Sequence, residues 1–251
     1  MQVCKNCHSP LDQSYCGVCG QKASVGRITL KGLIQELPHA IFHVDRGFQY
    51  NFINLFKRPG EAIIDFLKGK RKPFFHPASY LLIALVLNFI VVKVTDLHFY
   101  DEHELETMDV LQAQAVKDYD AMQWWFLEHT YIYILIAIPA STLFMFFLLK
   151  VLKQSFNVAE SAVIVLFVIS QGVLLQTMLY GLLGWIESGP FRRRLEVVNM
   201  VILISYAAWA IFHLLTSDRH KIIRISLSLI GGIGLAIVWI ASAYVPYLLL
   251  K

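Results

Sequence analysis

The stretch AESAVIVLFVISQGVLLQTMLYGLLG, residues 159–184, decides the fold class of this chain. It is predominantly apolar, and Glu160 is its only charged side chain. A helix of about 20 apolar residues crosses the roughly 30 Å of hydrocarbon in a bilayer. We therefore expect this stretch to be a membrane-spanning helix.

Four further apolar runs lie on either side of this stretch. The chain has 251 residues, of which 57% are hydrophobic and 16% charged, and its mean hydropathy of +0.55 is too high for a soluble domain of this size. The runs occupy residues 76–95, 131–150, 198–216 and 225–249. The predicted fold class is all-α, a polytopic membrane helix bundle over residues 76–251.

The distribution of basic residues predicts which side of the membrane each connection occupies. Residues 1–75 contain eleven lysines and arginines, whereas residues 96–130 contain nine acidic residues and one lysine, Lys117. Basic connections stay in the cytoplasm, and residues 1–21 do not have the pattern of a secretory signal. We expect a membrane protein with a cytoplasmic amino end and an acidic exported loop over residues 96–130.

The sequence FRRR at residues 191–194 leaves the number of spans open. With five spans this basic cluster lies on the exported side, against the usual rule. If residues 159–184 instead form a re-entrant segment, four spans remain and Arg192–Arg194 move to the cytoplasm. The sequence therefore predicts four or five spans.

All four cysteines of the chain lie in a polar head, residues 1–24. Cys4, Cys7, Cys16 and Cys19 form two C-x-x-C pairs, and such pairs supply four thiolates at the corners of a tetrahedral zinc site. Gly17 and Gly20 are expected to adopt positive φ around Cys19. With four cysteines present, His8 is interpreted as a bystander and not as a ligand.

Other roles for the four thiols fit the sequence less well. Two disulfides need an oxidising compartment, and a redox pair needs a strand–helix junction that this stretch does not supply. Iron–sulfur ligation stays open, because four thiolates also hold such clusters. We predict structural zinc, whose binding supplies the folding free energy of the head.

Residues 25–75 predict a collar of amphipathic helices between the head and the first span. Apolar residues recur at helical spacing from Leu30 to Val44, and a further helix begins at Pro59 and ends with Lys68 and Gly69. We expect these helices to lie along the inner membrane surface with their aromatic side toward lipid. The residues expected at anionic headgroups are Arg58, Lys68, Lys70, Arg71 and Lys72.

The order of motifs in the first third of the chain carries a resemblance. The four-cysteine head is followed by VDRGF, by RPG at residues 58–60 and by GKRKPFFHP at residues 69–77. This combination, over residues 1–85, resembles an uncharacterised family of bacterial inner-membrane proteins, classified as a domain of unknown function. The resemblance implies the same membrane architecture, and it supplies no catalytic residues.

Three other groups of residues have side chains suited to metal binding or to contacts between helices. His39, His43 and Asp45, with His76 near the first span, offer a metal site at the membrane edge, although a helix surface accounts for them more simply. The acidic run Asp101, Glu102, Glu104, Glu106 offers oxygen ligands for calcium but reads more simply as a solvated loop. Asn88, Gln171, Gln176 and Thr177 are expected to hydrogen-bond between spans, and Gly232 and Ala236 mark a close helix crossing, within one chain or in a homo-oligomer.

The predicted function is that of a non-enzymatic inner-membrane scaffold or accessory subunit. Its zinc head is expected to bind a cytoplasmic protein, and its bundle to contact membrane lipids and membrane partners. Nucleic acid is not an expected partner, because the basic residues concentrate beside the membrane. The alternative is an enzyme or transporter for a lipid or lipid-linked substrate, with His39, His43, Asp45, Arg58 and Arg71 at the cytoplasmic interface.

Overall fold

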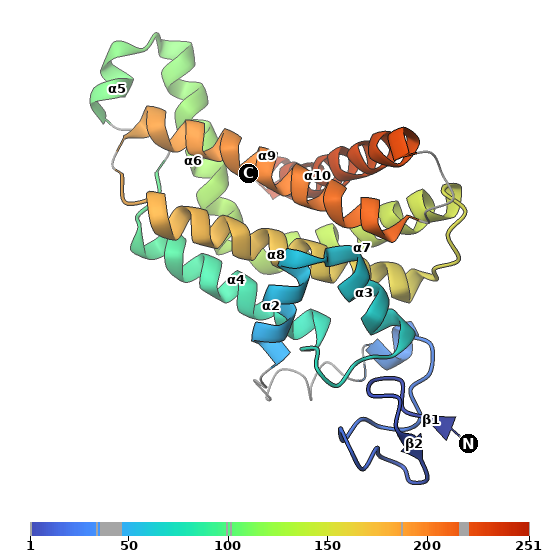
Figure 1. Ribbon diagram of the computed structural model, residues 1–251. Helices are drawn as coiled ribbons and strands as arrows, with labels where there is room; N and C mark the ends of the chain where they lie inside the picture. The colour runs from blue at the N-terminus through green and yellow to red at the C-terminus, as the bar shows by residue number, and fades with distance from the viewer. Residues whose placement is uncertain are drawn as a thin grey trace.

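The computed structural model describes residues 2–33, 35, 47–98, 100, 102–186, 188–215 and 221–250. In the head, strand β1 (Gln2–Val3) pairs antiparallel with strand β2 (Pro10–Leu11). The described residues that follow the head are mainly helical (Figure 1). The helices are α2 (Gly47–Lys57), α3 (Pro59–Lys68), α4 (Pro77–Val94), α5 (Glu102–Thr107), α6 (Val110–Glu128), α7 (Thr130–Val151), α8 (Val158–Leu183), α9 (Gly189–Leu214) and α10 (Lys221–Leu250).

Five helices in the described residues are long and apolar enough to cross a membrane. They correspond to the five apolar runs of the sequence and confirm the predicted fold class. The largest difference in a boundary is at α9, which begins at Gly189, nine residues before the predicted start at residue 198. The spanning segments are Pro77–Val94, Ile132–Val151, Val158–Leu183, Gly189–Leu214 and Lys221–Ser242.

Helix α8 occupies the centre of the bundle. It packs against α4, α7 and α9, and 89% of its most apolar window is buried. Asn157 and Glu160 close a capping box at its first turn. Its 26 residues form one unbroken helix of about 39 Å, with its first turn toward the head and its last toward α5 (Figure 1). A re-entrant segment turns back within the bilayer and needs a break in the helix, whereas α8 has none. The head end of the bundle is the side nearer the cysteines, and the far end is the side nearer α5.

Helix α4 runs parallel to α8 but starts part-way along it. The Tyr80 hydroxyl, in the first turn of α4, donates a 2.5 Å hydrogen bond to Gln171 near the middle of α8. At the other end of α4, Thr95 lies against Gly184. The head-end half of α8 is consequently left for other elements to cover.

A hairpin of α2 and α3 covers that half. Leu55 and Ile63 are fully buried, and the Tyr206 hydroxyl of α9 donates a 3.2 Å hydrogen bond to the Leu55 carbonyl. Gly60, at the start of α3, lies so close to His213 that a Cβ there would be 2.6 Å from the His213 carbonyl carbon. The hairpin is therefore part of the packed bundle.

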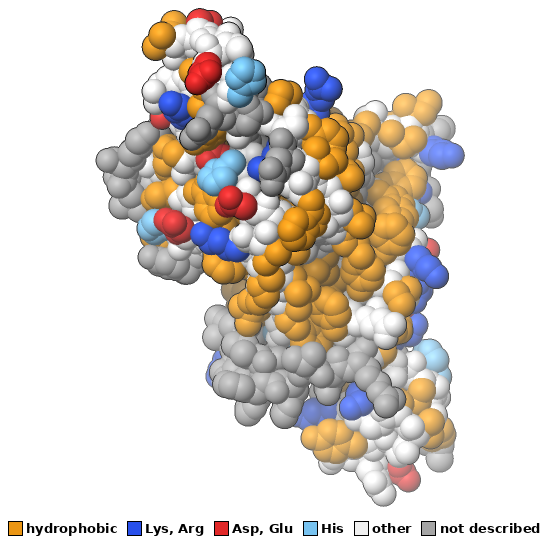
Figure 2. Space-filling view, turned by 90° about the vertical axis from the view of Figure 1, so that its left-hand side faces the viewer, with side chains coloured by type: hydrophobic (Ala, Val, Ile, Leu, Met, Phe, Trp, Pro, Cys, Tyr) orange, Lys and Arg blue, Asp and Glu red, His pale blue; other side chains and the backbone are white. Residues whose placement is uncertain are grey.

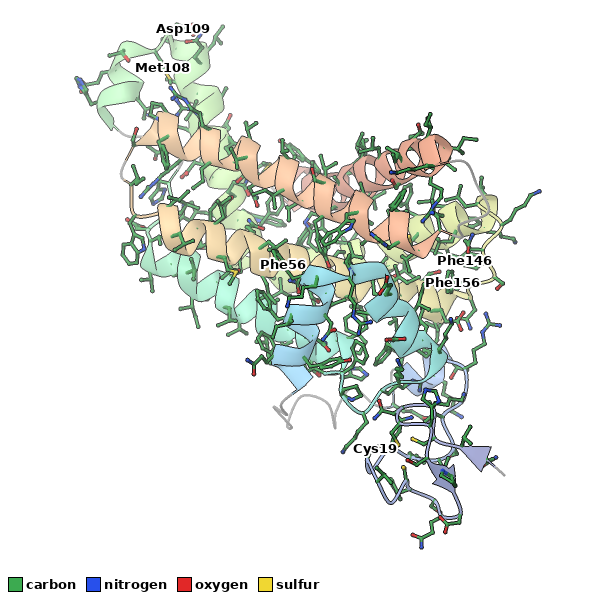
Figure 3. All side chains as sticks on the ribbon, viewed as in Figure 1. Cys19, Phe56, Met108, Asp109, Phe146 and Phe156 are labelled. Atoms are coloured by element: carbon green, nitrogen blue, oxygen red, sulfur yellow. The ribbon has the colours of Figure 1, made fainter. Side chains whose placement is uncertain are left out.

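The aromatic side chains of this region lie in the protein core. Phe66 packs edge-on against Phe167 of α8 at 5.2 Å between ring centroids, and Phe74 and Phe75 are buried beside it. The expectation that this aromatic side faces lipid is wrong for these three residues, because α8 offers a continuous apolar surface. Phe56, labelled in Figure 3, remains exposed on α2. Of the predicted helix from Leu30 to Val44, residues 30–33 are helical and most of the rest lies outside the described residues.

The predicted acidic exported loop, residues 96–130, is largely helical. Asp109 caps α6, accepting a 2.9 Å hydrogen bond from the Gln112 amide. Asp120 of this helix is buried, with its carboxylate 2.8 Å from His98 Nδ1. Glu106 is exposed, whereas Asp101 and the side chains of Glu102 and Glu104 lie outside the described part. The connection is thus an ordered layer over the far end of the bundle.

Three of the four polar residues predicted to join the spans do so, namely Asn88, Gln171 and Thr177. The Asn88 amide donates a 3.3 Å hydrogen bond to Thr177, and Gln171 accepts from Tyr80. Gly232 marks a close crossing between α10 and α9, where an added Cβ would lie 2.9 Å from the Ile204 carbonyl oxygen. This crossing is internal to the chain.

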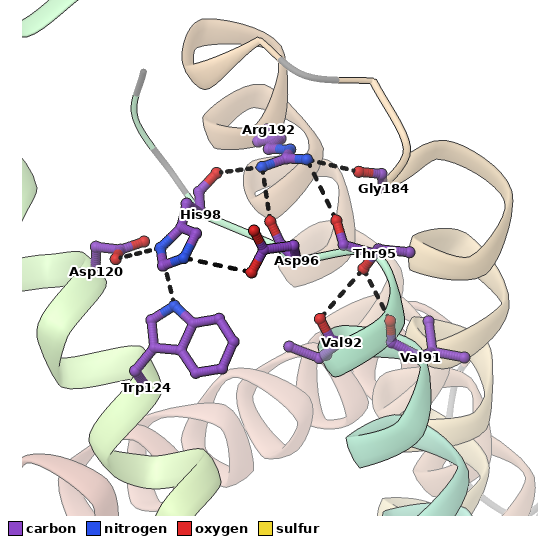
Figure 4. A network of polar contacts seen from close by, with 9 residues as sticks. All are labelled: Val91, Val92, Thr95, Asp96, His98, Asp120, Trp124, Gly184 and Arg192. Carbon is purple, nitrogen blue, oxygen red and sulfur yellow. Dashed lines mark hydrogen bonds and ion pairs between the residues drawn. The ribbon is translucent and has the colours of Figure 1, made fainter. Parts of the chain in front are cut away.

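Arg192 ties the far ends of three helices together (Figure 4). Its side chain is buried in the first turn of α9, and its guanidinium donates to five carbonyl oxygens at 3.0–3.4 Å. The last carbonyls of a helix have no partner within that helix, and a cation next to them is favourable. The five acceptors follow α4 or α8 and belong to Thr95, Asp96, His98, Gly184 and Ile186.

The outward surfaces of the spans are apolar. Leu135, Leu182 and Ile222 are each at least three-quarters exposed, although they lie in spanning segments. In Figure 2 hydrophobic side chains gather across the middle of the face, with charged side chains above them and the head below. This pattern suits helices whose outer surface contacts lipid.

Candidate metal centre and its attachment to the bundle

The two C-x-x-C pairs form two matching turns in the head. The His8 amide donates to the Cys4 carbonyl at 2.9 Å, and the Gly20 amide donates to the Cys16 carbonyl at 2.8 Å. The residue after each second cysteine has positive φ, 61° at His8 and 70° at Gly20. Gly20 therefore behaves as predicted, whereas Gly17 does not adopt positive φ. His8 takes the equivalent place in the first turn.

The four sulfurs converge on one point (Figure 3). All four Sγ atoms lie within 4.8 Å of one another, with 3.5 Å between Cys4 and Cys19 and between Cys7 and Cys16. A tetrahedral site with metal–sulfur bonds of about 2.3 Å requires sulfurs about 3.8 Å apart. A disulfide requires about 2.05 Å, and the four cysteines are free. The arrangement fits a single metal ion bound by four thiolates.

The surroundings of two cysteines favour the thiolate form that binds metals. Hydrogen bonds from the hydroxyl and backbone amide of Ser9 lower the pKa of Cys7 to about 6. The side chain of Asn6 lowers the pKa of Cys19. A donor hydrogen bond stabilises the charged form of a thiol, whereas burial and hydrogen bonds with Cys7 and Cys19 raise the pKa of Cys16 to about 11.

Gln21 attaches the head to the bundle. This side chain is buried and makes three hydrogen bonds to the loop that follows α3. Its Nε2 donates to the Gly69 carbonyl at 2.9 Å, and its Oε1 accepts from the Arg71 and Lys72 amides at 3.0 and 3.1 Å. The basic loop GKRK, residues 69–72, thus forms the attachment site of the head on the bundle, which we call its seat.

Gly69 makes this seat possible. It caps α3 with φ 109°, and its amide donates to the Phe66 carbonyl at 3.1 Å. A Cβ at Gly69 would lie 2.6 Å from Cδ of Lys5 in the first cysteine turn. The position therefore requires glycine for its backbone conformation, and a Cβ there would also displace the Lys5 side chain.

A second attachment joins the segment after the head to α8. The Arg27 guanidinium binds both carboxylate oxygens of Glu160 at 2.7 and 2.8 Å and donates to the Ser155 carbonyl at 2.7 Å. The side-chain amide of Asn157 donates to the Ile28 carbonyl at 3.1 Å. A bidentate arginine–carboxylate pair fixes orientation as well as position. The head is consequently held by two separate points.

The residues predicted at lipid headgroups divide into two groups. Lys68 and Lys72 are exposed. The other three make contacts within the protein: Lys70 Nζ lies 3.2 Å from Asp65, Arg71 donates to the Gly26 carbonyl at 2.7 Å, and Arg58 donates to Asn54 at 3.1 Å. These three side chains therefore hold the hairpin, its loop and the segment after the head in place.

The predicted histidine site cannot be assembled from the described part of the chain. His39, His43 and Asp45 lie outside the described residues. His76 immediately precedes α4 and lines a 200 Å³ cavity together with Arg71. Of the residues named for the interfacial enzyme site, Arg58 and Arg71 lie in the described part.

Residues 45–89 match the family model "Protein of unknown function (DUF3667)". No curated protein and no solved structure matches the chain. The match supports the predicted likeness to an uncharacterised family, and it leaves the four cysteines outside the matched segment.

The matched segment coincides with the parts that hold the head and the hairpin. It contains RPG, whose Gly60 contacts α9, and GKR, whose Gly69 and Arg71 receive the head. Both motifs therefore make contacts with parts of the chain that are distant in sequence.

One cluster of the bundle was missed by sequence reasoning. Glu196 of α9 lines a cavity with Tyr180 and Asn199 and accepts a hydrogen bond from the Tyr180 hydroxyl. It was overlooked because FRRRLE reads as a connecting loop, which places Glu196 before the fourth predicted span. The early start of α9 brings it inside.

Proposed function

We propose that this chain is a non-enzymatic inner-membrane scaffold or accessory subunit, with zinc as the ion in its head. Zinc favours a closed site of four cysteines, which leaves no coordination position for a substrate. The excess of basic residues before the first span supports a cytoplasmic head. Lys68 and Lys72 are then well placed for anionic lipid headgroups.

Exposed apolar side chains on the head support the proposal of a protein partner. Val3, Tyr15 and Val18 are 57%, 60% and 76% exposed on a segment of only two dozen residues. Val18 lies in the second cysteine turn, between Cys16 and Cys19. A head stapled by metal and attached at two points presents these apolar side chains in a fixed orientation, which lowers the entropy cost of binding.

Copurification from the native membrane tests this function. The full chain is compared with Val18→Asp, which places a charge on the exposed turn, and with Gln13→Asp, which adds the same charge at an exposed polar position of the head. We expect Val18→Asp to lose a partner that the unaltered chain and Gln13→Asp both retain, while its zinc content stays unchanged.

The enzymatic alternative makes the opposite forecast. Under the scaffold proposal, His39→Ala and Arg58→Ala leave the set of bound proteins and the lipid composition of the membrane unchanged. A lipid conversion that disappears in both variants would replace the scaffold proposal with an interfacial enzyme.

A further inference from the structure

A cavity of about 410 Å³ lies in the far-end half of the bundle. It is bounded by α4, α6, α7, α8, α9 and α10, and its volume falls within the range of small-molecule sites, about 300–1,000 Å³. Its wall is mainly apolar and aromatic. The aromatic members of the wall are Tyr119, Trp124, Phe126, Tyr133, Tyr180, Trp239 and Tyr244.

A small polar cluster interrupts this wall. Glu196 accepts a hydrogen bond from the Tyr180 hydroxyl, and the Asn199 amide donates to the same hydroxyl at 3.4 Å. Asn199 is only 2% exposed, and its Oδ1 has no hydrogen-bond partner among the residues that the structure describes. An unsatisfied buried acceptor is unfavourable, so a donor from a ligand would be favourable here.

One acidic side chain lies in this wall without a basic counterpart. Among the described lining residues Glu196 is the only acidic one, and none is a lysine, arginine or histidine. Lys93 approaches from outside, with Nζ 4.2 Å from the centroid of the Trp124 ring, and does not line the cavity. Carboxylates at this depth are expensive and usually belong to ligand or ion pathways.

We propose that this cavity binds an amphipathic molecule with a protonated primary or secondary amine. The ammonium N–H groups hydrogen-bond to the Glu196 carboxylate and to Asn199 Oδ1, and the apolar part of the molecule lies against the aromatic wall. The site is independent of the head and of the partner proposed for it.

The choice of an amine follows from the two acceptors. A protonated amine supplies both a positive charge for Glu196 and at least two N–H donors. A quaternary ammonium group has the charge but no donor, and an alcohol has one donor but no charge. The cavity should therefore rank these three classes with the amine first.

Binding to the full chain in phosphatidylcholine nanodiscs tests this ranking. The probes are octylamine, octanol and octyltrimethylammonium, and the signal is the fluorescence of Trp124 and Trp239, which both line the cavity. Empty nanodiscs correct for partition into lipid. We expect octylamine to bind at least about tenfold more tightly than the other two probes, a difference of about 1.4 kcal/mol.

Two variants locate the site. Glu196→Gln should weaken octylamine binding at least about tenfold and leave octanol binding unchanged. Glu128→Gln alters an exposed carboxylate of α6 and should change neither. Equal affinity of the unaltered chain for octylamine and octanol would overturn the proposal, and this comparison decides the matter even if Glu196→Gln does not fold. Unchanged octylamine binding in a folded Glu196→Gln variant would also overturn it.

Discussion

Arg192 accounts for the basic cluster that conflicts with a five-span arrangement. A guanidinium that donates to five carbonyl oxygens is fixed to the ends of α4 and α8, so it cannot be treated as a free charge of a connecting loop. Arg194, two residues later, is exposed. One of the arginines in this cluster is therefore required by the packing of the far end.

Replacing Arg192 by methionine should destabilise the protein. Methionine keeps most of the aliphatic length but leaves the carbonyls after α4 and α8 without a donor, which costs about 2 kcal/mol or more. Thermal unfolding in detergent should show a midpoint lower by about 4–8 °C. Arg194→Met is the matched control and should change the midpoint by less than about 2 °C. Equal midpoints for the two variants would contradict the role of Arg192.

The metal content of the head can be tested at single residues. Elemental analysis of the purified chain should find about one zinc ion per molecule, and none after Cys4→Ser and Cys16→Ser together. His8→Gly should retain the zinc, because glycine accepts the positive φ at this position without strain. Loss of zinc in His8→Gly would show that the imidazole is a ligand. Visible iron–sulfur absorbance would exclude zinc as the native ion.

The sequence predicts residues whose partners are close in the chain and misses those whose partners are remote. The four cysteines were identified from spacing, because each turn is a local structure. Gln21 was not singled out, since its partners lie 48–51 positions away. Glu196 and Arg192 lie in a stretch whose sequence predicts a loop. Their burial depends on the ends of α4 and α8 and on the wall of the cavity, which the local sequence does not reveal.

At the scale of elements, the hairpin α2–α3 and its loop connect the head to the membrane bundle. The RPG motif turns the chain between the two helices and brings Gly60 against α9. The GKR motif ends α3 and presents backbone groups to Gln21. The sequence predicted the limits of α3 correctly from Pro59 and Gly69, but the packing partners of the hairpin required the structure.

Weakening the seat of the head should detach it without unfolding the bundle. Gln21→Leu removes three hydrogen bonds and leaves the buried Gly69 carbonyl without its donor, at a cost of about 1–3 kcal/mol. Limited proteolysis of the full chain should then cut between residues 22 and 30 several times faster. Gln13→Leu, at an exposed position, should be cut at the original rate. Equal rates in both variants would contradict this attachment.

The glycine of the seat gives an independent test of the same contact. Gly69→Ala forces a side chain into a backbone conformation with φ 109° and into contact with Lys5. The expected cost is about 1–3 kcal/mol, visible as a lower unfolding temperature and faster proteolysis of the head. The double variant Gly69→Ala with Lys5→Ala should regain part of the loss, since it removes the collision but not the backbone strain. Full stability of Gly69→Ala would show that the head does not rest on this loop.

At the scale of the whole molecule, an odd number of spans places the two ends of the chain on opposite sides. The described helices alternate in direction from α4 through α7, α8 and α9 to α10 (Figure 1). With the head in the cytoplasm, the far end with its acidic residues faces the exported side, as the charge distribution predicts. The Arg192 contacts explain why the basic residues of α9 are compatible with that side.

Reporter fusions test this arrangement. Alkaline phosphatase joined after Thr95, Ser188 or Lys251 should be active, because each junction lies on the exported side in the five-span arrangement. A fusion after Lys153, between α7 and α8, should be inactive. An inactive fusion after Ser188 would indicate that α8 does not cross the membrane, in conflict with its unbroken helix.

The hydrogen bond between Tyr206 and Leu55 has a consequence for biogenesis. These partners are separated by 151 positions, which a ribosome translating about 5–20 residues per second takes roughly 8–30 s to synthesise. During that interval the apolar face of the α2–α3 hairpin has been made, but its binding surface on α9 has not. The hairpin can therefore pack against α8 before α9 exists, but it completes its contacts only after the fourth span has been made.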